Sequence, residues 1–379
     1  MDNINEYVNK MKKAHALLLD FLEKEEYLDE DYDNLIKLYD ELNFKSKKEY
    51  LEEFLILIST ISKNHHHNRT FYTKIIKILD KYEQDISRNF TSHEIFQIFK
   101  NSKRILLYFI EKKMIIITKD IADVMLNPKH IKFYYDSYFY PEIKDFVKQK
   151  PDIKYIDRFA ELRQIGENED EACKIIRSDS VKDFEDFVKR SNKNSVQNIF
   201  FPLTIYETSW AILRKGAWLT DYAAYSGSFN IFNYLVSQNA GLKQDLWIFA
   251  IHGNNIQILE RLKQTIMKPY ADTRMRSLIE SYKCHHIKVT DFVWKNYFQK
   301  VKKKSDVDFD VDDDDVEEEE DYDDFDNGLF NRFVYAFKYH NYSCFPKNLN
   351  KAAFFYDLCQ FNYVRIVELF LQSNDFKFD

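Results

Sequence analysis

The sequence predicts an all-α fold made of stacked helical hairpins, and three observations support this prediction. The 379 residues contain only six glycines and six prolines, fewer turn residues than an all-β fold or a glycine-rich phosphate loop requires. Apolar residues recur three and four positions apart along most of the chain, which indicates amphipathic helices. One pattern of small, turn and apolar residues also repeats in the second half, as in arrays whose neighbouring units bury each other's apolar faces.

The first 130 residues contain successive helix patterns. NLIKLYDELNF carries apolar residues at 35, 36, 38, 39 and 42, and EYLEEFLILISTIS and FYTKIIKILDKY show similar spacing. In FTSHEIFQIFKNSKRILLYFIEKK, Thr91 or Ser92 caps a first helix over 94–99, and a second helix follows over 103–112. Shorter helical pieces are then separated by three prolines, Pro128, Pro141 and Pro151.

The repeated unit is clearest in three segments of the second half. They are AAYSGSFNIFNYL from Ala223, AIHGNNIQILERL from Ala250 and SYKCHHIKVTDFV from Ser281, so their starts are 27 and 31 residues apart. A turn residue comes four places after each start, namely Gly227, Asn254 and His285. Apolar residues come at six, eight and twelve places: Phe229, Ile256 and Ile287; Ile231, Ile258 and Val289; Leu235, Leu262 and Val293. Fainter copies begin at Ile175, Leu358 and Gln97.

This order of residues predicts two antiparallel helices in each unit. The small residue lets a neighbouring helix approach closely, the turn residue reverses the chain, and the apolar residues share one face of the second helix. A single hairpin cannot cover that face, so neighbouring units must stack into a helical-hairpin solenoid.

The pattern resembles the ankyrin repeat, whose consensus runs roughly A-A-x-x-G-H-x-x-(V/I)-(V/I)-x-x-L. The residues that match are Ala223, Ala224, Gly227, Ile231, Phe232 and Leu235. His286 falls where the family often has its histidine, and Trp247 stands where ankyrin first helices bury a leucine. Ankyrin units span about 33 residues, and the spacing of 27 is shorter. We therefore expect ankyrin-like repeats with shortened or absent β-hairpin tips.

Most of residues 20–300 is also similar to a large class of degenerate ankyrin-like proteins expanded in unicellular parasites. The segments that carry this resemblance are NHHHNRTFYTKIIKIL, SHEIFQIFKNSKRILLYFIE, YFYPEIKDF, IIRSDSVKDF and DYAAYSGSFNIFNYL…LWIFAIHGNN. The resemblance implies a helical array with no known catalytic activity. By resemblance to ankyrin proteins, exposed side chains just before the inter-helix turns would contact a protein partner: Tyr225, Ser226, His252, Gly253 and Lys283.

An acidic run, SDVDFDVDDDDVEEEEDYDDFDN, interrupts this composition at 305–327. Residues 306–326 hold fifteen carboxylates and no basic residue, so the rest of the chain sums to −7 + 15 = +8. Like charge at this density predicts disorder, with helices resuming near Leu329. We expect four parts, which are an N-terminal helical region with degenerate repeats (1–165), an ankyrin-like array (166–304), a disordered insertion (305–327) and C-terminal repeat-like helices (328–379).

Three groups of residues invite a metal-site interpretation, and each has a plainer one. Consecutive histidines on a helix point about 100° apart and cannot easily converge on one ion, so 65–67 is predicted to be a polar turn. The group 284–286, Cys-His-His, occupies a predicted turn and favours a satisfied structural histidine. The acids from Asp306 to Glu317 match calcium-loop spacing, but Val311 replaces the required glycine. We therefore predict no metal site and no cofactor.

Other function classes lack their sequence signatures. Basic residues are dispersed, so the aromatic residues indicate a core rather than nucleic-acid stacking, and no nucleic acid is expected. No apolar run approaches about 18 residues and the first ten residues do not resemble a signal peptide, so we expect no membrane span and an intracellular, cytoplasmic location. The four scattered cysteines fit free thiols. Phosphate-loop, nucleophile-elbow and HExxH motifs are absent from the sequence.

These observations predict a non-enzymatic scaffold or adaptor that binds protein partners. A second hypothesis assigns function to the acidic segment, which would capture a basic protein such as a histone or ribosomal protein. A third is an unrecognised hydrolase that uses scattered Asp, Glu and His. A deep polar pocket with perturbed carboxylates would favour the third hypothesis.

Overall fold

The computed structural model describes residues 2–127, 135–147, 158–191, 200–201, 204–209, 211–212, 216–265, 269–299, 333–347, 349 and 352–373. Helices make up 73% of this part of the chain, which contains 22 α-helices and one pair of two-residue strands. The all-α prediction is therefore confirmed. The acidic run at 305–327 and Leu329 lie outside the described residues.

The N-terminal half of the chain contains eleven α-helices and two short 3-10 helices within the described ranges. In chain order these are α1 (Asp2–Glu23), α2 (Asp29–Leu42), η1 (Phe44–Ser46), α3 (Lys48–Asn64), α4 (Phe71–Lys81), α5 (Glu83–Asn89), α6 (Ser92–Phe99), α7 (Lys103–Glu111), α8 (Lys119–Leu126), α9 (Tyr135–Tyr138), α10 (Tyr140–Ile143), η2 (Lys144–Phe146) and α11 (Phe159–Ile165).

The second half consists mainly of helix pairs. In chain order its described elements are α12 (Glu171–Arg177), α13 (Val181–Arg190), β1 (Phe200–Phe201), β2 (Ala217–Trp218), α15 (Leu219–Tyr225), α16 (Phe229–Ser237), α17 (Leu246–His252), α18 (Ile256–Thr265), α19 (Ala271–Cys284), α20 (Ile287–Tyr297), α21 (Phe333–Lys338), η4 (Tyr342–Cys344), α22 (Ala352–Gln360) and α23 (Val364–Gln372). The two strands pair antiparallel, Phe200 opposite Trp218. The connection 238–245 between α16 and α17 contains no strand.

The helix pair α6 and α7 shows how local sequence sets the boundaries. Thr91 is the N-cap of α6, and its hydroxyl accepts from the Glu94 amide at 3.3 Å while its own amide donates to Glu94 Oε2 at 2.8 Å. This reciprocal pair satisfies two amide groups that the first turn would leave without a partner. The expected pair over 94–99 and 103–112 is confirmed, since α6 ends at Phe99 and α7 spans Lys103–Glu111.

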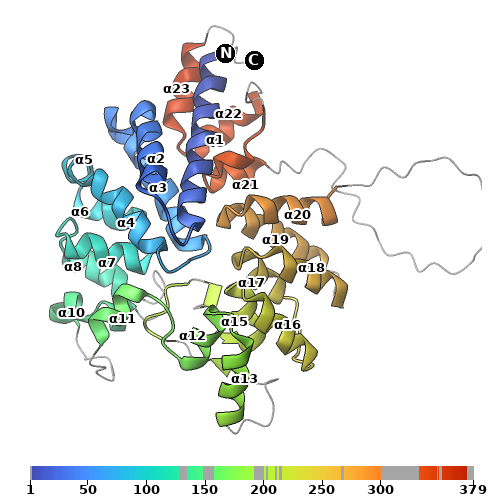
Figure 1. Ribbon diagram of the computed structural model, residues 1–379. Helices are drawn as coiled ribbons and strands as arrows, with labels where there is room; N and C mark the ends of the chain where they lie inside the picture. The colour runs from blue at the N-terminus through green and yellow to red at the C-terminus, as the bar shows by residue number, and fades with distance from the viewer. Residues whose placement is uncertain are drawn as a thin grey trace, which may run out of the picture.

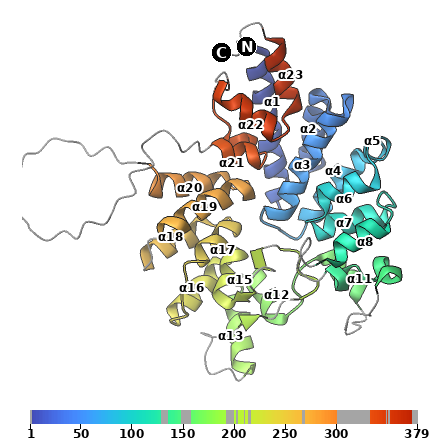
Figure 2. The same cartoon turned by 180° about the vertical axis from the view of Figure 1, so that it is seen from behind.

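Two rows of helices stack side by side along the second half. The inner row runs α12, α15, α17, α19 and α21, each helix in contact with the next, and α19 also contacts α3 of the N-terminal half. The outer row runs α13, α16, α18 and α20 in the same way. Figure 1 shows these pairs in green to orange, and Figure 2 shows the same order from behind. Each helical hairpin thus lies against the next, as the unpaired apolar faces require.

The register that the sequence predicts for these hairpins is confirmed. The three turn residues Gly227, Asn254 and His285 adopt left-handed φ values of 69°, 51° and 59°, which end a helix and reverse the chain. The small residues at the starts of the units are buried, as are the apolar residues eight and twelve places on; they are Ala223, Ala250, Ser281, Ile231, Ile258, Val289, Leu235, Leu262 and Val293. The fainter copies from Ile175 and Leu358 also form hairpins, with Asp179 and Asn362 at φ 52° and 63°.

A further unit follows α20 that the sequence comparison missed. Ala336 is fully buried in α21, and His340, four places on, has φ 55°. The sequence between α20 and α21 holds the acidic run, so the spacing from Ser281 to Ala336 is far from 27 or 31 residues. A repeat of constant length therefore does not predict this unit.

Side chains just after each turn link one unit to the previous one. Ser228 Oγ donates to Ile176 O at 2.6 Å, and Asn255 Nδ2 donates to Gly227 O at 2.9 Å. The same position in the next two units makes two more such bonds, His286 Nδ1 to Ile251 O at 2.7 Å and Asn341 Nδ2 to Tyr282 O at 2.9 Å. We call these four bonds the inter-unit ladder. They add an acceptor contact to carbonyl groups near the ends of the inner helices, three of which also accept a main-chain amide within their own turn.

Two glycines allow the first two of these units to meet backbone to backbone. A Cβ added at Gly253 would lie 2.0 Å from Ala224 O, and one added at Gly227 would lie 2.5 Å from Gly253 O. No side chain fits at either distance. Gly253 has φ −69°, an ordinary helical value, so close packing alone requires a glycine there.

The two ends of the described chain lie together, as Figures 1 and 2 show at the top of each view. Helix α1 contacts α23 and η4, and α3 also contacts α23. Lys12 Nζ donates to the carbonyls of Phe345 and Pro346 at 3.1 and 3.0 Å, and Lys47 pairs with Glu368 at 2.7 Å. The chain therefore closes on itself, with α1 and α3 inside the path.

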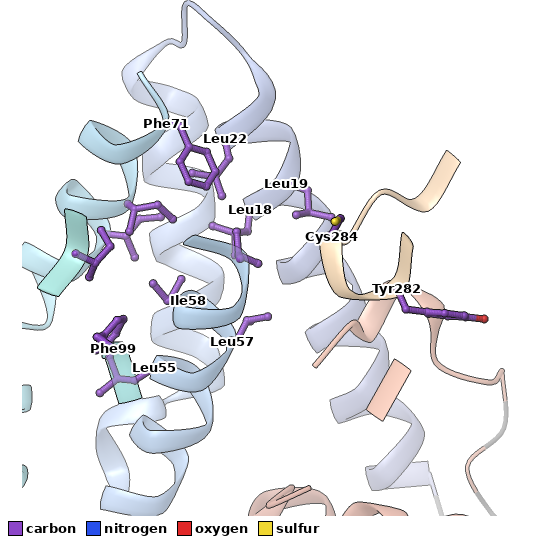
Figure 3. Packing of buried hydrophobic residues seen from close by; sticks show 14 of the residues in the cluster. Leu18, Leu19, Leu22, Leu55, Leu57, Ile58, Phe71, Phe99, Tyr282 and Cys284 are labelled. Atoms are coloured by element: carbon purple, nitrogen blue, oxygen red, sulfur yellow. The ribbon is translucent and has the colours of Figure 1, made fainter. Parts of the chain in front are cut away.

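The apolar core extends from the N-terminal helices to the inner row. Figure 3 shows Leu18, Leu19 and Leu22 of α1 with Leu55, Leu57 and Ile58 of α3, Phe71 of α4 and Phe99 of α6, and Cys284 of α19 at the edge of the group. All of these side chains are buried. Trp247 is also buried, as expected. The N-terminal half is therefore packed on the hairpin rows rather than joined to them by a linker.

Candidate functional site

The five residues predicted to contact a partner lie at the ends of three successive inner helices. Tyr225 and Ser226 end α15, His252 and Gly253 end α17, and Lys283 lies in the last turn of α19. Tyr225, Ser226 and Lys283 are half-buried. His252 and Gly253 are buried, so the expectation that these two residues are exposed is wrong. The reason is the tight packing of α17 between α15 and α19, which the hairpin pattern does not reveal.

His252 belongs to a buried polar cluster with the end of α19. Its Nε2 lies 2.8 Å from Glu280 Oε1, and Lys283 Nζ donates to the same oxygen at 2.6 Å. Burial alone would raise the pKa of Glu280, but its partners His252 and Lys283 outweigh burial and lower that pKa. Lys283 in turn has a raised pKa, because Glu280 outweighs its own burial. Glu280 is thus held as a carboxylate by two neighbours.

The same cluster contains a set of potential metal ligands. Atoms of His252, Glu280 and Cys284 lie within 4.8 Å of one another, and Cys284 Sγ is 3.4 Å from His252 Nδ1. Burial raises the pKa of the Cys284 thiol well above its usual range, whereas a metal needs the thiolate. Lys283 already donates a hydrogen bond to the Glu280 carboxylate. These contacts describe an ion-paired packing cluster better than a cation site.

Histidines from three separate segments meet between the N-terminal helices and the inner row, and we call this group the histidine seam. Its members are His15 of α1, His65, His66 and His67 after α3, and His285 and His286 after α19. His15 Nε2 is 2.7 Å from His285 Nδ1, and the Ser343 amide donates to His15 Nδ1 at 3.2 Å. His15 Nδ1 therefore carries no proton, and the Nε2 proton is donated to His285.

The rest of the seam is bonded in the same way. His65 Nδ1 donates to Cys284 O at 2.8 Å, and the His66 amide donates to His286 Nε2 at 3.1 Å. His286 Nδ1 donates to Ile251 O as part of the inter-unit ladder. Both nitrogens of His286 are thus occupied in its neutral form. Residues 65–67 do lie in the connection between two helices, as predicted, but these histidines also link the N-terminal half to the inner row.

Burial lowers the pKa of most of these histidines. The pKa of His15 falls to about 3, that of His66 to about 4 and that of His67 to about 3. Those of His285 and His286 fall well below the usual value, again because of burial. These five histidines are therefore uncharged at neutral pH.

Beside the seam lies a polar cavity of about 510 Å³. It is formed where the α3–α4 connection, the start and end of α12, the segment 204–209 and the end of α15 come together. Its lining residues are Glu25, His66, His67, Asn68, Arg69, Gly166, Glu167, Lys174, Arg177, Ser178, Glu207, Tyr222, Tyr225 and Ser226. Two of the predicted partner residues, Tyr225 and Ser226, thus lie on its wall.

Glu207 is the most unusual group in this cavity. Its side chain is 4% exposed, and its Oε1 accepts from the Ser209 amide at 2.8 Å. Burial raises its pKa to about 7, against the opposing effects of the Ser209 bond and the Arg177 charge. A carboxyl group with this pKa in a cavity is typical of binding and acid–base sites.

The other buried charge in the cavity is matched. Arg177 Nε pairs with Glu167 at 2.9 Å, Nη1 donates to Tyr222 OH at 2.6 Å and Nη2 donates to Asn168 O at 2.9 Å. Lys103 lies behind Glu207, where its Nζ donates to the carbonyls of Ile205 and Glu207 at 3.4 and 3.3 Å. Burial lowers the pKa of Lys103 to about 7.

The sequence did not single out Glu207, Glu167 or Arg177. They come from three segments with no common motif, and Glu207 stands in a stretch, IYETSW, that follows no helix pattern. The one available signal is that Arg177 is the third residue of the fainter repeat from Ile175. Without the fold, nothing relates that arginine to a glutamate thirty residues later.

In the ranges that the structure covers, none of the helices combines the length and the apolar character needed to span a bilayer. The comparisons with protein-family models, curated proteins and solved structures found no match to this chain.

Proposed function

We propose that this protein is a non-enzymatic scaffold whose two helix rows form an ankyrin-like solenoid that binds a protein partner. The observation that supports it is the repeated hairpin, with the same turn, the same buried positions and the same inter-unit bond in successive units. Arrays of this kind hold many side chains on a stiff frame, which suits recognition of another protein.

The surface for that partner is narrower than the resemblance implies. His252 and Gly253 are buried where α17 packs between α15 and α19, so they support the frame. Tyr225 and Ser226 border an open cavity, and they are the residues from which we expect partner contact. Tyr225 also packs against the ring of His252 at 5.7 Å, which holds it in place.

Site-specific photo-crosslinking tests this proposal. A benzophenone amino acid in place of Tyr225 should capture the same protein reproducibly in the native cell, and the Ser226→Arg variant should reduce that capture. Tyr270 is a matched control, because it is 69% exposed at the start of α19 and away from the cavity. Equal capture from both positions, or none from Tyr225, would contradict the proposal.

The acidic-segment hypothesis remains a prediction, because residues 305–327 lie outside the described part. Binding of a basic protein that falls steeply with salt and is lost on deletion of 306–326 would support it. The scaffold proposal predicts that partner capture at position 225 survives the deletion.

A hydrolase is the second candidate, since Glu207 supplies the perturbed carboxyl group that this hypothesis requires. A hydrolase of the serine type also needs a hydroxyl group bonded to a base. Among the described contacts, neither cavity serine meets this need, since Ser178 donates to Ile175 O and Ser226 has no bond to a histidine or carboxylate. The cavity therefore fits binding better than nucleophilic catalysis.

A further inference from the structure

The cavity beside the histidine seam has an inner end built around one acid. Glu207 is almost fully buried and is bonded by the Ser209 amide through Oε1, and in the described part of the chain Oε2 accepts no hydrogen bond. A carboxyl group removed from water loses free energy unless donors replace that water. Lys103 does not supply one, because its Nζ donates to main-chain carbonyls. Oε2 is open to the cavity rather than sealed in the core, so a donor on a ligand can reach it.

The walls around this acid favour a cation. Tyr222 and Tyr225 lie with ring centroids 6.4 Å apart on the cavity wall, and aromatic faces attract ammonium groups. His66 and His67 also line the cavity, and burial keeps both uncharged at neutral pH. The Arg177 guanidinium is already matched by Glu167. Arg177 and Lys103, the two cations whose charges act on Glu207, thus make their own bonds to other groups, which leaves Glu207 Oε2 for an ammonium group.

The outer edge of the same cavity has the opposite character. Arg69 and Lys174 are exposed, and within the described residues neither makes an ion pair. They come from opposite sides, Arg69 from the α3–α4 connection and Lys174 from α12. Glu25 is the exposed acid at this edge, which leaves a net positive edge. A carboxylate on the ligand would be attracted there.

We propose that this cavity binds a small dipolar molecule, a primary amine that also carries a carboxylate. Its ammonium group lies against Glu207 between Tyr222 and Tyr225, and its carboxylate lies at Arg69 and Lys174. This ligand site goes beyond the scaffold proposal and does not depend on a protein partner.

Calorimetry on the full chain with a graded series of probes tests it. The probes are unbranched ω-amino acids from glycine to 6-aminohexanoate, each with its matched alkylamine and its matched carboxylic acid. We expect one length to bind about tenfold or more tightly than either matched compound, because each charged end adds a charge-assisted bond. Titration at pH 7 in buffers of different ionisation heat should show release of about half a proton, since a bound ammonium group ionises a carboxyl group that is half protonated.

Two variants separate the two ends of the site. Glu207→Gln should abolish the proton release and weaken the amino acid about tenfold or more, while Glu260→Gln, on the exposed surface of α18, should change neither. Arg69→Ala with Lys174→Ala should lower the affinity of the amino acid to that of the alkylamine and leave the alkylamine unaffected. Circular dichroism melting confirms that each variant is folded.

Three results would overturn the proposal. They are the absence of binding by every ω-amino acid up to about 10 mM, binding that a folded Glu207→Gln variant retains in full, and alkylamines that bind as tightly as the amino acids. Partner capture at position 225 is measured separately, so failure of the ligand site leaves the scaffold proposal standing.

Discussion

At the scale of single residues, His286 connects three parts of the structure through one ring. Its ring donates to Ile251 O, accepts from the His66 amide, and so joins two array units and the N-terminal half at one point. No other side chain of similar size supplies one donor and one acceptor on opposite sides of a flat ring.

The first prediction follows from those two bonds. His286→Ala should lower the free energy of unfolding by about 2–5 kcal/mol, because it removes the acceptor of the His66 amide and one of the two donors to Ile251 O and opens a cavity. Urea denaturation measures the change. His93→Ala is the control, since His93 is exposed on α6, and it should cost less than about 0.5 kcal/mol. Similar losses for the two variants would show that the seam bonds contribute little.

Gly253 provides the second residue-scale prediction. Gly253→Ala should destabilise the protein by about 1–3 kcal/mol, because its new methyl group would overlap Ala224 O. Gly241→Ala introduces the same group where nothing lies within 4 Å, and it should be neutral within about 0.5 kcal/mol. Thermal melting of the two variants gives the comparison. A neutral Gly253→Ala would mean that α15 and α17 are not packed this closely.

At the scale of the elements, the hairpin is the unit of structure, and both of its helices contribute buried apolar residues to the core. Leu235 of α16 is fully buried and Leu262 of α18 nearly so. Both belong to the continuous apolar core, so each leucine should stabilise the stack of hairpins as well as the helix that carries it.

The third prediction concerns these two leucines. Leu235→Ala and Leu262→Ala should each cost about 2–5 kcal/mol, as deletions of buried leucines do. Ala250→Arg should cost more, because Ala250 is fully buried where α15 and α19 close on α17. Leu371→Ala on α23 is the control, since that side chain is 60% exposed. Changes below about 0.5 kcal/mol at all three buried positions would refute the hairpin register.

At the scale of the whole molecule, the histidine seam couples folding to pH. Several histidines are neutral in the fold, and protonation of His15 or His286 would place a new proton against the amide of Ser343 or His66. In the unfolded chain the same histidines accept protons near pH 6.5. The seam therefore favours the folded state above that pH.

The fourth prediction states the direction of this dependence. When folding lowers the pKa of a histidine, the free energy of unfolding decreases as the pH falls below 6.5, because only the unfolded chain takes up the proton. At pH 5.5 this costs about 1 kcal/mol for each such histidine, and five of them line the seam. The buried acids Glu53 and Glu207 have raised pKa values of about 8 and about 7, so the folded chain takes up their protons before the unfolded chain does. This uptake stabilises the fold as the pH falls and offsets part of the loss.

We therefore expect a net loss of a few kcal/mol between pH 7 and pH 5.5, measured by urea denaturation at each pH. His15→Gln removes one titrating group, so its stability should depend less steeply on pH than that of the parent chain. A stability that is flat or rises as the pH falls to 5.5 would show that the seam is open to solvent.

The sequence by itself determined the helices and their register. Turn residues, small residues and apolar residues act within about a dozen positions, and their periodicity is enough to fix where each hairpin starts, reverses and buries its face. Ala223, Asn254 and Leu262 stand in the structure where that local pattern put them. The sequence pattern did not predict the unit that follows α20, because the long acidic run changes the spacing between repeats there.

The tertiary structure alone decided the burial of His252, the seam and the cavity. His15 and His285 are 270 residues apart, and His65 bonds a carbonyl 219 residues away. Glu207, Arg177 and His66 meet only because α1 and α3 pack inside the path of the chain. Local periodicity specifies which face of a helix is apolar, but several distant apolar surfaces can satisfy that face. The choice among them depends on the summed packing of many helices, which no short stretch of sequence contains.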